Sequence, residues 1–581
     1  MNKSSGRSKP HAGIAGKKGD GTGMAGNRGG SARNAQNLAN HAKLPMPKHK
    51  ERDGITTYLL LCAILALGLI LAYYLYSGPF YSFDDLTYIS LAHNVLLGGF
   101  NPLNNPYSYG FLVPLSIAAS FAAFGVNVFA SILPSLAAYL AIVLVSFAAA
   151  KKLYGNRAGL LSAFLAATAP FVVGYSTRVL PDMGLGLSVG LSLLFFVYAR
   201  SSTNKKIFYF LSGTFAAITV YVKMVGLAYI IAFATALVLY RLVKMGRALK
   251  DADNSAISYP LAGMLVMGAV FVAIISGFGG SALGTIIKYG ANQAAISHST
   301  IPENMHALYV MALGYSHFGP SADPQMYPLG LTIIIALAGT VIGFAKRDRI
   351  AIAMSAAMWM PVAYLFFGTV TISRYTAIYA GVARYFIMVA VPMVLLACYA
   401  IIELYNASQR LFGRNRALYP AIMVILVLIV SYVPGYATLH NYNTMISGDT
   451  EAFSAALMKA AAGQQYGTEF TLVVTGTTSS EFLQFLSGYS SGARIMALNT
   501  SSAESSGRQL AVMCAPQSKN TYIAVAYDSY SEQRYGEIFD SWISRMCKLR
   551  PLGNFTDAAS SGSAYNSTNV HISLYKVVGQ P

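Results

Sequence analysis

The sequence predicts an all-α polytopic membrane domain of about eleven transmembrane helices, with its N-terminus inside, followed by a small extracytoplasmic α/β domain. Three observations support this fold class. The 581 residues are 55% hydrophobic and only 11% charged, whereas about a quarter of a soluble protein is charged. Apolar runs of membrane-spanning length recur up to residue 438. Positive charges gather in alternate connections between these runs, as they do in polytopic membrane proteins.

Residues 1–53 are rich in Gly, Ser, Asn, Ala, Lys and Arg and hold almost no large apolar side chain. Such a segment cannot bury enough apolar surface to offset its chain entropy, so we expect a disordered basic cytoplasmic tail. Its charge would suit either anionic lipid headgroups or cytoplasmic partners. The net charge of +19 is concentrated in this tail and in short connections, which indicates membrane topology and argues against a nucleic-acid partner.

The transmembrane domain is expected over residues 54–438, with one helix on each apolar run. No small-residue cleavage site follows the first run, so we expect an uncleaved spanning helix rather than a signal peptide. Residues 108–124 are also apolar, but the stretch is short and carries Pro114, and we place it flat at the membrane surface. The predicted spans are residues 55–77, 126–149, 158–177, 182–200, 207–222, 224–243, 258–278, 327–345, 350–370, 385–405 and 419–438.

The distribution of Lys and Arg tests this arrangement. With the tail inside, the even-numbered connections hold the clusters of positive charge, whereas the first external loop, residues 78–125, holds none. Counting residues 108–124 as a span would invert every later connection and destroy the asymmetry. The clusters are Lys151, Lys152 and Arg157; Arg200, Lys205 and Lys206; Arg241, Lys244 and Lys250; Lys346, Arg347 and Arg349; and Arg410, Arg414 and Arg416.

Residues 439–581 lack long apolar runs and gain Ser, Thr and Gly. Short β-like stretches at 470–475, 521–526 and 570–577 alternate with helical patterns, which predicts the extracytoplasmic α/β domain. The four cysteines do not form a zinc or disulfide framework, and only Cys514 and Cys547 could pair.

Two adjacent carboxylates, Asp84 and Asp85, follow the first helix in the loop that has no cation. One Asp there would serve as a helix N-cap, which is the structural alternative. Two of them favour a functional interpretation, in which at least one carboxylate serves chemistry or a metal.

Other polar residues recur on the outer side of the membrane. Arg178 and Asp182 lie in the turn between the third and fourth helices, where an exposed ion pair four residues apart is equally plausible. A lone lysine, Lys223, could simply reach the interface. Arg374 and Arg384 stand with several tyrosines before the tenth helix, as an interfacial belt or as a site for an anion such as phosphate.

The long external loop, residues 279–326, carries His298, Glu303 and His306. The two histidines do not have the tight spacing of metal ligands. We therefore expect this loop to be a mobile lid or to bind an acceptor.

These residues resemble the polyprenyl-phosphate-dependent membrane glycosyltransferases of the GT-C fold, notably the dolichyl-phosphate-mannose protein mannosyltransferases and the bacterial aminoarabinose lipid A transferases. Asp84-Asp85 is similar to the family's Asp-Glu pair in the first external loop, with the shorter Asp85 where Glu is usual. Arg178 and Asp182 resemble the family's Arg-x-x-x-Asp stretch that opens the fourth helix.

Two further motifs extend the resemblance, which covers about residues 55–438. Lys223 with Gly226 resembles the Lys-x-x-Gly step that ends a short helix, and Arg384-Tyr385 resembles the Arg-Tyr segment that opens a late helix. Each motif is short, but the four occur in the family's order and on one side of the membrane.

The resemblance implies transfer of a single sugar, with inversion, from a polyprenyl- or dolichyl-phosphate donor to an extracytoplasmic hydroxyl of a protein, glycan or lipid. It implies that Asp84 and Asp85 are the catalytic residues, with Asp84 as the general base and Asp85, like Asp182, orienting that base, binding the acceptor or holding a divalent ion. No obligate cofactor is expected. A divalent cation, if one binds, would be held by Asp84 and Asp182.

The remaining site residues follow from the same resemblance. The donor phosphate would be bound by Arg384, Arg374, Lys223 and Arg178, in that order of preference. The acceptor would be bound or oriented by Asp182, Tyr88, His298, Glu303 and His306.

Other functional classes remain open from the sequence. A transporter or flippase of a lipid-linked saccharide would also have many helices and outer cations, but its ionisable groups usually lie near the midplane of the bilayer. A non-catalytic membrane subunit and an oligosaccharide-transferring relative are further alternatives. The position of nearly all charges at helix ends favours an enzyme that works at the interface.

Overall fold

The structure is a computed structural model. It describes residues 54–76, 83–245, 254–296, 300–313, 329, 331–368, 383–412, 419–420, 422–433, 435–437, 470–475, 493–498, 521–527, 548–556 and 571–579. The predicted tail, His298, Arg374, Cys514 and Cys547 lie outside these residues.

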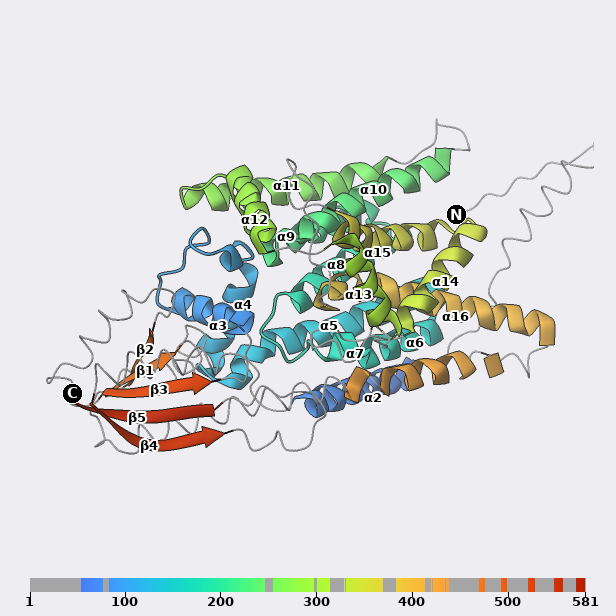
Figure 1. Cartoon of the computed structure of the whole chain (residues 1–581). Coiled ribbons are helices and arrows are strands. Elements are labelled where there is room, and N and C mark those ends of the chain that lie inside the picture. Colours follow the sequence, from blue (N-terminus) through green and yellow to red (C-terminus); the bar gives the residue numbers. More distant parts are fainter. Residues whose placement is uncertain are drawn as a thin grey trace, which may run out of the picture. The chain divides into compact units, whose positions relative to one another are not determined.

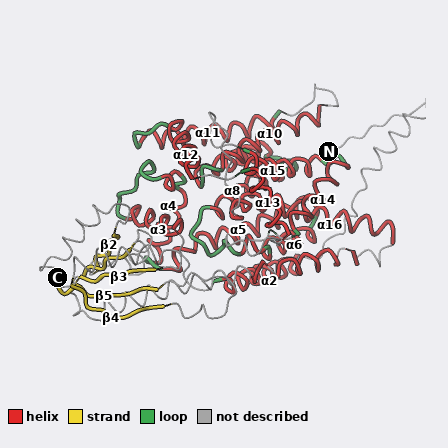
Figure 2. Tube along the Cα trace, in the orientation of Figure 1, coloured by secondary structure: helices red, strands yellow, loops and turns green. Residues whose placement is uncertain are grey.

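The described part of residues 54–437 is helical (Figures 1 and 2). The elements are α2 (Gly54–Leu75), α3 (Phe83–Leu96), the 3₁₀ helix η1 (Pro106–Tyr109), α4 (Leu112–Phe124), α5 (Val128–Tyr154), α6 (Asn156–Thr168), α7 (Pro170–Val173), α8 (Asp182–Ala199), α9 (Lys205–Val222), α10 (Gly226–Met245), α11 (Ser255–Gly277), α12 (Ala282–Ile296), α13 (Ile301–Leu313), α14 (Thr332–Ala345), α15 (Arg349–Phe367), the 3₁₀ helix η3 (Ala383–Val389) and α16 (Ala390–Phe412). A further apolar helix occupies Ile422–Ala437.

The helices fit a polytopic membrane protein. Among the described residues, six helices are long and apolar enough to cross a membrane. They are Gly54–Leu75, Val128–Tyr154, Asp182–Ala199, Ser255–Gly277, Arg349–Phe367 and Arg384–Leu411. Four shorter apolar helices accompany them. The predicted run 158–177 is divided into α6 and α7 because Pro170 cannot continue a helix and begins a new one. The total of eleven spans stays a prediction.

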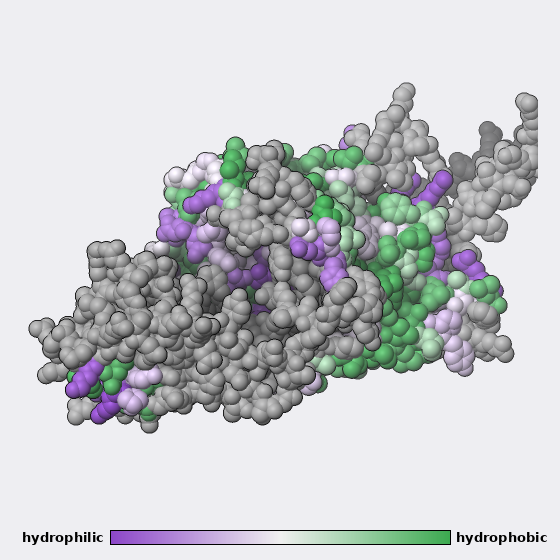
Figure 3. Space-filling model, viewed as in Figure 1, coloured by the Kyte–Doolittle hydropathy of each residue, from purple (hydrophilic) through white to green (hydrophobic). Residues whose placement is uncertain are grey.

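The surface of the helices carries large apolar side chains, as a lipid-facing surface requires. Ile55 and Tyr73 on α2, Leu265 on α11 and Val341 on α14 are all exposed. Figure 3 shows a broad area of hydrophobic residues on the described surface, with hydrophilic residues gathered on either side of it. Such a large exposed apolar area would be a liability in water and is natural in a bilayer.

The segment predicted to be the first external loop contains three short helices within its described residues. Helices α3 and α4 contact each other, and η1 contacts both α3 and α12. Pro114 lies in the first turn of α4, where its missing N–H costs no hydrogen bond. The helix ends at Gly125, whose φ of 77° suits glycine. The expected flat orientation of residues 108–124 on the membrane stays a prediction.

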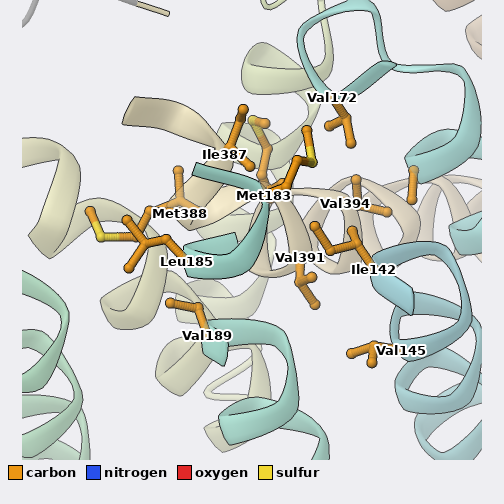
Figure 4. Packing of buried hydrophobic residues seen from close by; sticks show 14 of the residues in the cluster. Ile142, Val145, Val172, Met183, Leu185, Val189, Ile387, Met388, Val391 and Val394 are labelled. Atoms are coloured by element: carbon orange, nitrogen blue, oxygen red, sulfur yellow. The ribbon is translucent and has the colours of Figure 1, made fainter. Parts of the chain in front are cut away.

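The core that supports this loop is built from α5, α7, α8, η3 and α16. Side chains from these elements interdigitate, with Ile142, Leu185, Ile387 and Val391 among those fully enclosed (Figure 4). A β-carbon at Gly186 would lie only 2.6 Å from the carbonyl oxygen of Ile387. The missing side chain therefore lets α8 approach η3 closely. This contact places the start of α8 against η3, the segment that directly precedes α16.

Residues 470–579 contribute a five-stranded sheet of order β2-β1-β3-β5-β4. The strands are β1 (Phe470–Thr475), β2 (Ala493–Leu498), β3 (Thr521–Tyr527), β4 (Lys548–Thr556) and β5 (His571–Gly579). The pairs β1–β2 and β1–β3 are parallel, whereas β3–β5 and β4–β5 are antiparallel. The sequence predicted β1, β3 and β5; β2 and β4 have weaker patterns and were not foreseen.

Candidate functional site

Asp84 is the centre of a group of polar contacts. Both of its carboxylate oxygens accept hydrogen bonds: Oδ1 from the Tyr107 hydroxyl at 2.7 Å and Oδ2 from Nη1 of Arg384 at 2.5 Å. Asp84 and Arg384 are separated by 300 positions in the chain. Each keeps 19% of its side chain exposed, so this ion pair is within reach of a ligand.

A second ion pair lies beside the first. Nζ of Lys223 donates to Oδ1 of Asp182 at 2.9 Å and lies 4.7 Å from the centre of the Tyr385 ring. The guanidinium of Arg384 lies 5.8 Å from the same ring. Two cations therefore share one aromatic ring, whose electron-rich face offsets part of their repulsion. We call Asp84, Arg384, Tyr385, Lys223 and Asp182 the charged cluster.

Asp85 faces away from this cluster and has no exposed surface. Its Oδ1 accepts the backbone N–H of Val179 at 2.7 Å, and its Oδ2 lies 3.8 Å from Nη1 of Arg178. The side chain of Arg178 is 7% exposed. We call Asp85, Arg178 and Val179 the anchor, because they tie the first turn of α3 to the turn that precedes α8.

The surroundings of Asp84 keep it ionised. Burial alone would raise the pKa of Asp84, but the charge of Arg384, the hydrogen bonds from Tyr107 and Arg384, and the charge of Lys223 together lower the pKa below its ordinary value. Burial and the negative charge of Asp84 raise the pKa of Tyr107. Tyr107 therefore keeps its proton and remains a donor to the carboxylate.

Each residue of the charged cluster stands at a helix end or break. Asp84 and Asp182 lie in the first turns of α3 and α8, where a negative charge complements the helix dipole. Lys223 has an extended backbone, with φ −159° and ψ 133°, and separates α9 from α10. Arg384 lies in η3, directly before α16. Helix ends converge here from four segments of the chain.

Gly110 brings two parts of the site together. A β-carbon at this position would overlap the carbonyl oxygen of Val222 and would lie 3.3 Å from the backbone nitrogen of Lys223. Only glycine lets the end of η1, which carries Tyr107, approach the break that carries Lys223.

Tyrosines surround the polar groups. Tyr88 is buried and makes an edge-to-face contact with Tyr107, at a ring distance of 5.6 Å. Tyr88 therefore supports the ring that holds Asp84 rather than holding Asp84 itself. Tyr289 of α12 packs edge-on against Tyr109 at 6.5 Å. The sequence analysis did not identify Tyr107 or Tyr289 as site residues. The one available signal for Tyr107 was its position between Pro106 and Ser108, in the loop that contains no Lys or Arg.

The remaining predicted residues are not part of the charged cluster as described. Glu303 is exposed in the first turn of α13, where it accepts the N–H of Thr300 at 2.7 Å while its own N–H lies 3.4 Å from the Thr300 hydroxyl. This reciprocal pair is a helix capping box. His306 follows on the exposed part of the same helix. His298 and Arg374 are outside the described residues.

The described residues do not offer a metal site of ordinary composition. No group of three or more His, Cys, Asp and Glu side chains gathers within the described part of the chain. Asp84 and Asp182, the two candidates for a divalent cation, each pair with a cationic side chain instead. We therefore derive no step through a metal.

Comparison with known proteins identifies the fold. Residues 108–275 match the family described as dolichyl-phosphate-mannose-protein mannosyltransferase. This stretch includes Arg178, Asp182 and Lys223, while Asp84 and Arg384 lie outside it. No match was found among curated protein sequences.

Solved structures extend the likeness over most of the chain. The structure of ArnT from Cupriavidus metallidurans bound to undecaprenyl phosphate aligns with a TM-score of 0.58 and 11% identity, over 90% of this chain and 98% of that one. The apo state of the same protein aligns with a TM-score of 0.51 and 12% identity, over 88% and 97%. An Archaeoglobus fulgidus oligosaccharyltransferase tethered to an acceptor peptide aligns with a TM-score of 0.49 and 12% identity, over 88% and 74%.

The helical architecture, the family match within it and the alignment with ArnT agree with one another. The chain is an integral-membrane protein with the GT-C fold seen in ArnT, and its residues 108–275 are similar to the dolichyl-phosphate-mannose-protein mannosyltransferase family.

Proposed function

We propose that the protein is a glycosyltransferase that moves a single sugar from a polyprenyl- or dolichyl-phosphate donor to an extracytoplasmic hydroxyl, with inversion at the anomeric carbon. The observation that carries this proposal is the Asp84–Arg384 pair. It joins an ionised carboxylate to a cation in a partly exposed position, and both types of group are needed for the reaction.

The chemistry assigns a role to each member of the charged cluster. Asp84 accepts the proton of the acceptor hydroxyl as its oxygen attacks the anomeric carbon from the side opposite the phosphate. The bond to the phosphate oxygen breaks, and the electron pair leaves with the lipid phosphate. Arg384 and Lys223 stabilise that negative charge. A phosphate leaving group is a weak base, so no general acid is required.

The geometry refines the predicted roles. Arg178 is buried against Asp85, so we propose that Arg384 and Lys223 contact the phosphate, while Arg178 acts through the anchor. Asp85 likewise positions α3 rather than contacting the donor. One oxygen of Asp182, Oδ2, is buried and has no partner among the described residues. It is suited to accept a hydrogen bond from a sugar or acceptor hydroxyl.

The likeness to ArnT, whose structure holds undecaprenyl phosphate, supports a lipid-phosphate donor. The acceptor class, whether protein, glycan or lipid, follows from the family resemblance alone. We further propose that the tail is cytoplasmic and that both the charged cluster and the C-terminal domain are extracytoplasmic, since the positive charges lie in the connections on the other side.

The test uses the full-length protein reconstituted in vesicles with a panel of radiolabelled polyprenyl-phosphate sugars and peptide or glycolipid acceptors. Wild type is compared with Asp84→Asn and with Asp348→Asn. The second variant makes the same chemical change at a residue that caps α15, where Asn is an equally good cap. We expect transfer to fall about 10²- to 10⁴-fold in Asp84→Asn only.

The outcomes separate the functional classes. A rate in Asp84→Asn close to that of wild type would exclude this residue as the base. Movement of donor across the bilayer without transfer would indicate a flippase. Binding without transfer or movement, over the whole panel of acceptors, would indicate a non-catalytic subunit.

A further inference from the structure

Arg384 donates a hydrogen bond to Oδ2 of Asp84, an oxygen that a general base needs free to accept a proton. Tyr107 donates to one carboxylate oxygen, and Arg384 donates to the other. A carboxylate held by two donors, one of them charged, is a weak base, because both contacts stabilise its ionised form. The structure therefore shows Asp84 in a state that binds a proton poorly.

The Asp84–Arg384 pair differs from the other two ion pairs around it. The side chains of Asp85 and Arg178 are 0% and 7% exposed, and those of Asp182 and Lys223 are 1% and 13% exposed. In the Asp84–Arg384 pair both partners are 19% exposed. Among these three pairs it is the most exposed, so an entering anion reaches its cation most readily and the released carboxylate can remain solvated.

Arg384 is also equipped to take a second anion. Its Nη1 binds Asp84, but its Nε is buried and has no hydrogen-bond partner among the described residues. A guanidinium presents its N–H groups in a planar fork that matches the oxygens of a phosphate. Tyr107 is independent of this contact and would still hold Oδ1 of Asp84 if Arg384 turned away.

We propose that the donor phosphate displaces Asp84 from Arg384, so that the carboxylate becomes an effective base only when the donor is bound. The inference rests on the proposed function, because it takes the lipid phosphate as the ligand of Arg384. Tyr107 keeps Asp84 in place after the exchange, and Lys223 stays on the more deeply buried Asp182. The exchange would also limit attack by water in the absence of a correctly bound donor.

The competition between Asp84 and phosphate for one guanidinium makes a counterintuitive prediction. Removing the charge of Asp84 should strengthen binding of a lipid phosphate, because the ligand no longer has to replace an internal partner. Hydrogen bonds to charged groups are worth enough that we expect roughly a ten- to hundredfold lower Kd for Asp84→Asn than for wild type. If Arg384 instead held both anions at once, the variant would bind more weakly.

The experiment measures binding of radiolabelled undecaprenyl phosphate, which carries no sugar, to purified full-length protein in detergent. Wild type, Asp84→Asn, Arg384→Gln and the double variant form a double-mutant cycle. Removing a negative charge also lessens general repulsion of the phosphate, and the cycle isolates this effect. We expect the gain from Asp84→Asn to shrink to under roughly threefold when Arg384 is already Gln. Asp348→Asn should bind as wild type does, and thermal unfolding confirms that each variant is folded.

Each result has one meaning. A gain in affinity that depends on Arg384 supports the exchange. An unchanged or weaker affinity in Asp84→Asn overturns it, as does a gain that persists in Arg384→Gln. These outcomes leave the transfer assay untouched, so the glycosyltransferase proposal stands or fails separately. Absence of binding to every protein overturns the exchange together with the role of Arg384 as a phosphate ligand.

Discussion

Asp84 and Asp85 are adjacent in the chain and occupy the same helical turn, yet their surroundings are opposite. Successive residues of an α-helix point about 100° apart, so one side chain reaches the charged cluster while the other enters the anchor. The side chain of Asp84 keeps 19% of its surface exposed, and that of Asp85 keeps none. Two neighbouring acids thus occupy different surroundings, which fits the proposed division into a structural role for Asp85 and a chemical role for Asp84.

The anchor explains why the Asp84–Arg384 pair can stay partly exposed and still be ordered. Burying a charge is costly unless it is paired and hydrogen-bonded, and Asp85 has both an ion pair and a backbone N–H as partners. These contacts hold the first turn of α3 on the segment before α8. Asp84 therefore does not need to be buried in order to be placed.

The largest expected effect is a difference in the free energy of unfolding between the Asp85→Asn and Asp84→Asn variants. Asp85→Asn removes the carboxylate charge that pairs with the buried guanidinium of Arg178, which should reduce the free energy of unfolding by about 3–5 kcal/mol. Asp84→Asn should lose on the order of 1 kcal/mol, because both partners retain contact with solvent. Thermal unfolding of the two purified variants in the same detergent measures the difference.

The rates of sugar transfer should rank the same two variants in the opposite order. We expect the folded fraction of Asp85→Asn to retain transfer far better than Asp84→Asn does. The division of roles is wrong if Asp85→Asn is as stable as wild type but as inactive as Asp84→Asn.

Much of this fold could be predicted from the sequence, because the membrane imposes long apolar runs and an asymmetric distribution of charge. The GT-C resemblance and three of the strands were likewise visible in short patterns. The roles of Asp84 and Asp85 could not be separated, since a motif gives spacing but not the direction in which a side chain points. The pairing of Asp84 with Arg384 joins residues 300 positions apart, and no local pattern encodes such a contact.

A substitution at Gly110 should have a smaller effect, because it disturbs the charged cluster at Lys223 and leaves the anchor unchanged. Gly110→Ala would press a methyl group against the carbonyl of Val222, at the break that carries Lys223. Overpacking of this kind typically costs about 1–3 kcal/mol. We expect η1 and Lys223 to move apart and transfer to fall about tenfold or more, since small misplacements of catalytic groups are expensive.

A second glycine provides the control for that substitution. Gly268 lies inside α11 and would meet no atom within 4 Å if a β-carbon were added. Gly268→Ala should therefore leave transfer unchanged and leave stability equal or raise it by up to about 1 kcal/mol. Similar rates for the two alanine variants would show that the close approach at Gly110 does not position the charged cluster.

The smallest effect concerns the hydrogen bond from Tyr107 to Asp84. Because that bond helps to lower the pKa of Asp84, Tyr107→Phe should raise this pKa. A general base works when ionised, so kcat/KM falls as the pH drops through the pKa of the free enzyme. The fall should begin at a higher pH in the variant, while at neutral pH the loss stays within about tenfold.

Tyr139→Phe is the control, because it removes a buried hydroxyl that donates to the carbonyl of Ala167 and should leave the pH profile of kcat/KM unchanged. Coinciding profiles for wild type and Tyr107→Phe would mean that Arg384 and Lys223 set the ionisation of Asp84 without help from Tyr107. The ionisation of Asp84 would then rest on neighbouring cations, whereas Asp85 in the anchor combines an ion pair with a hydrogen bond from a backbone N–H.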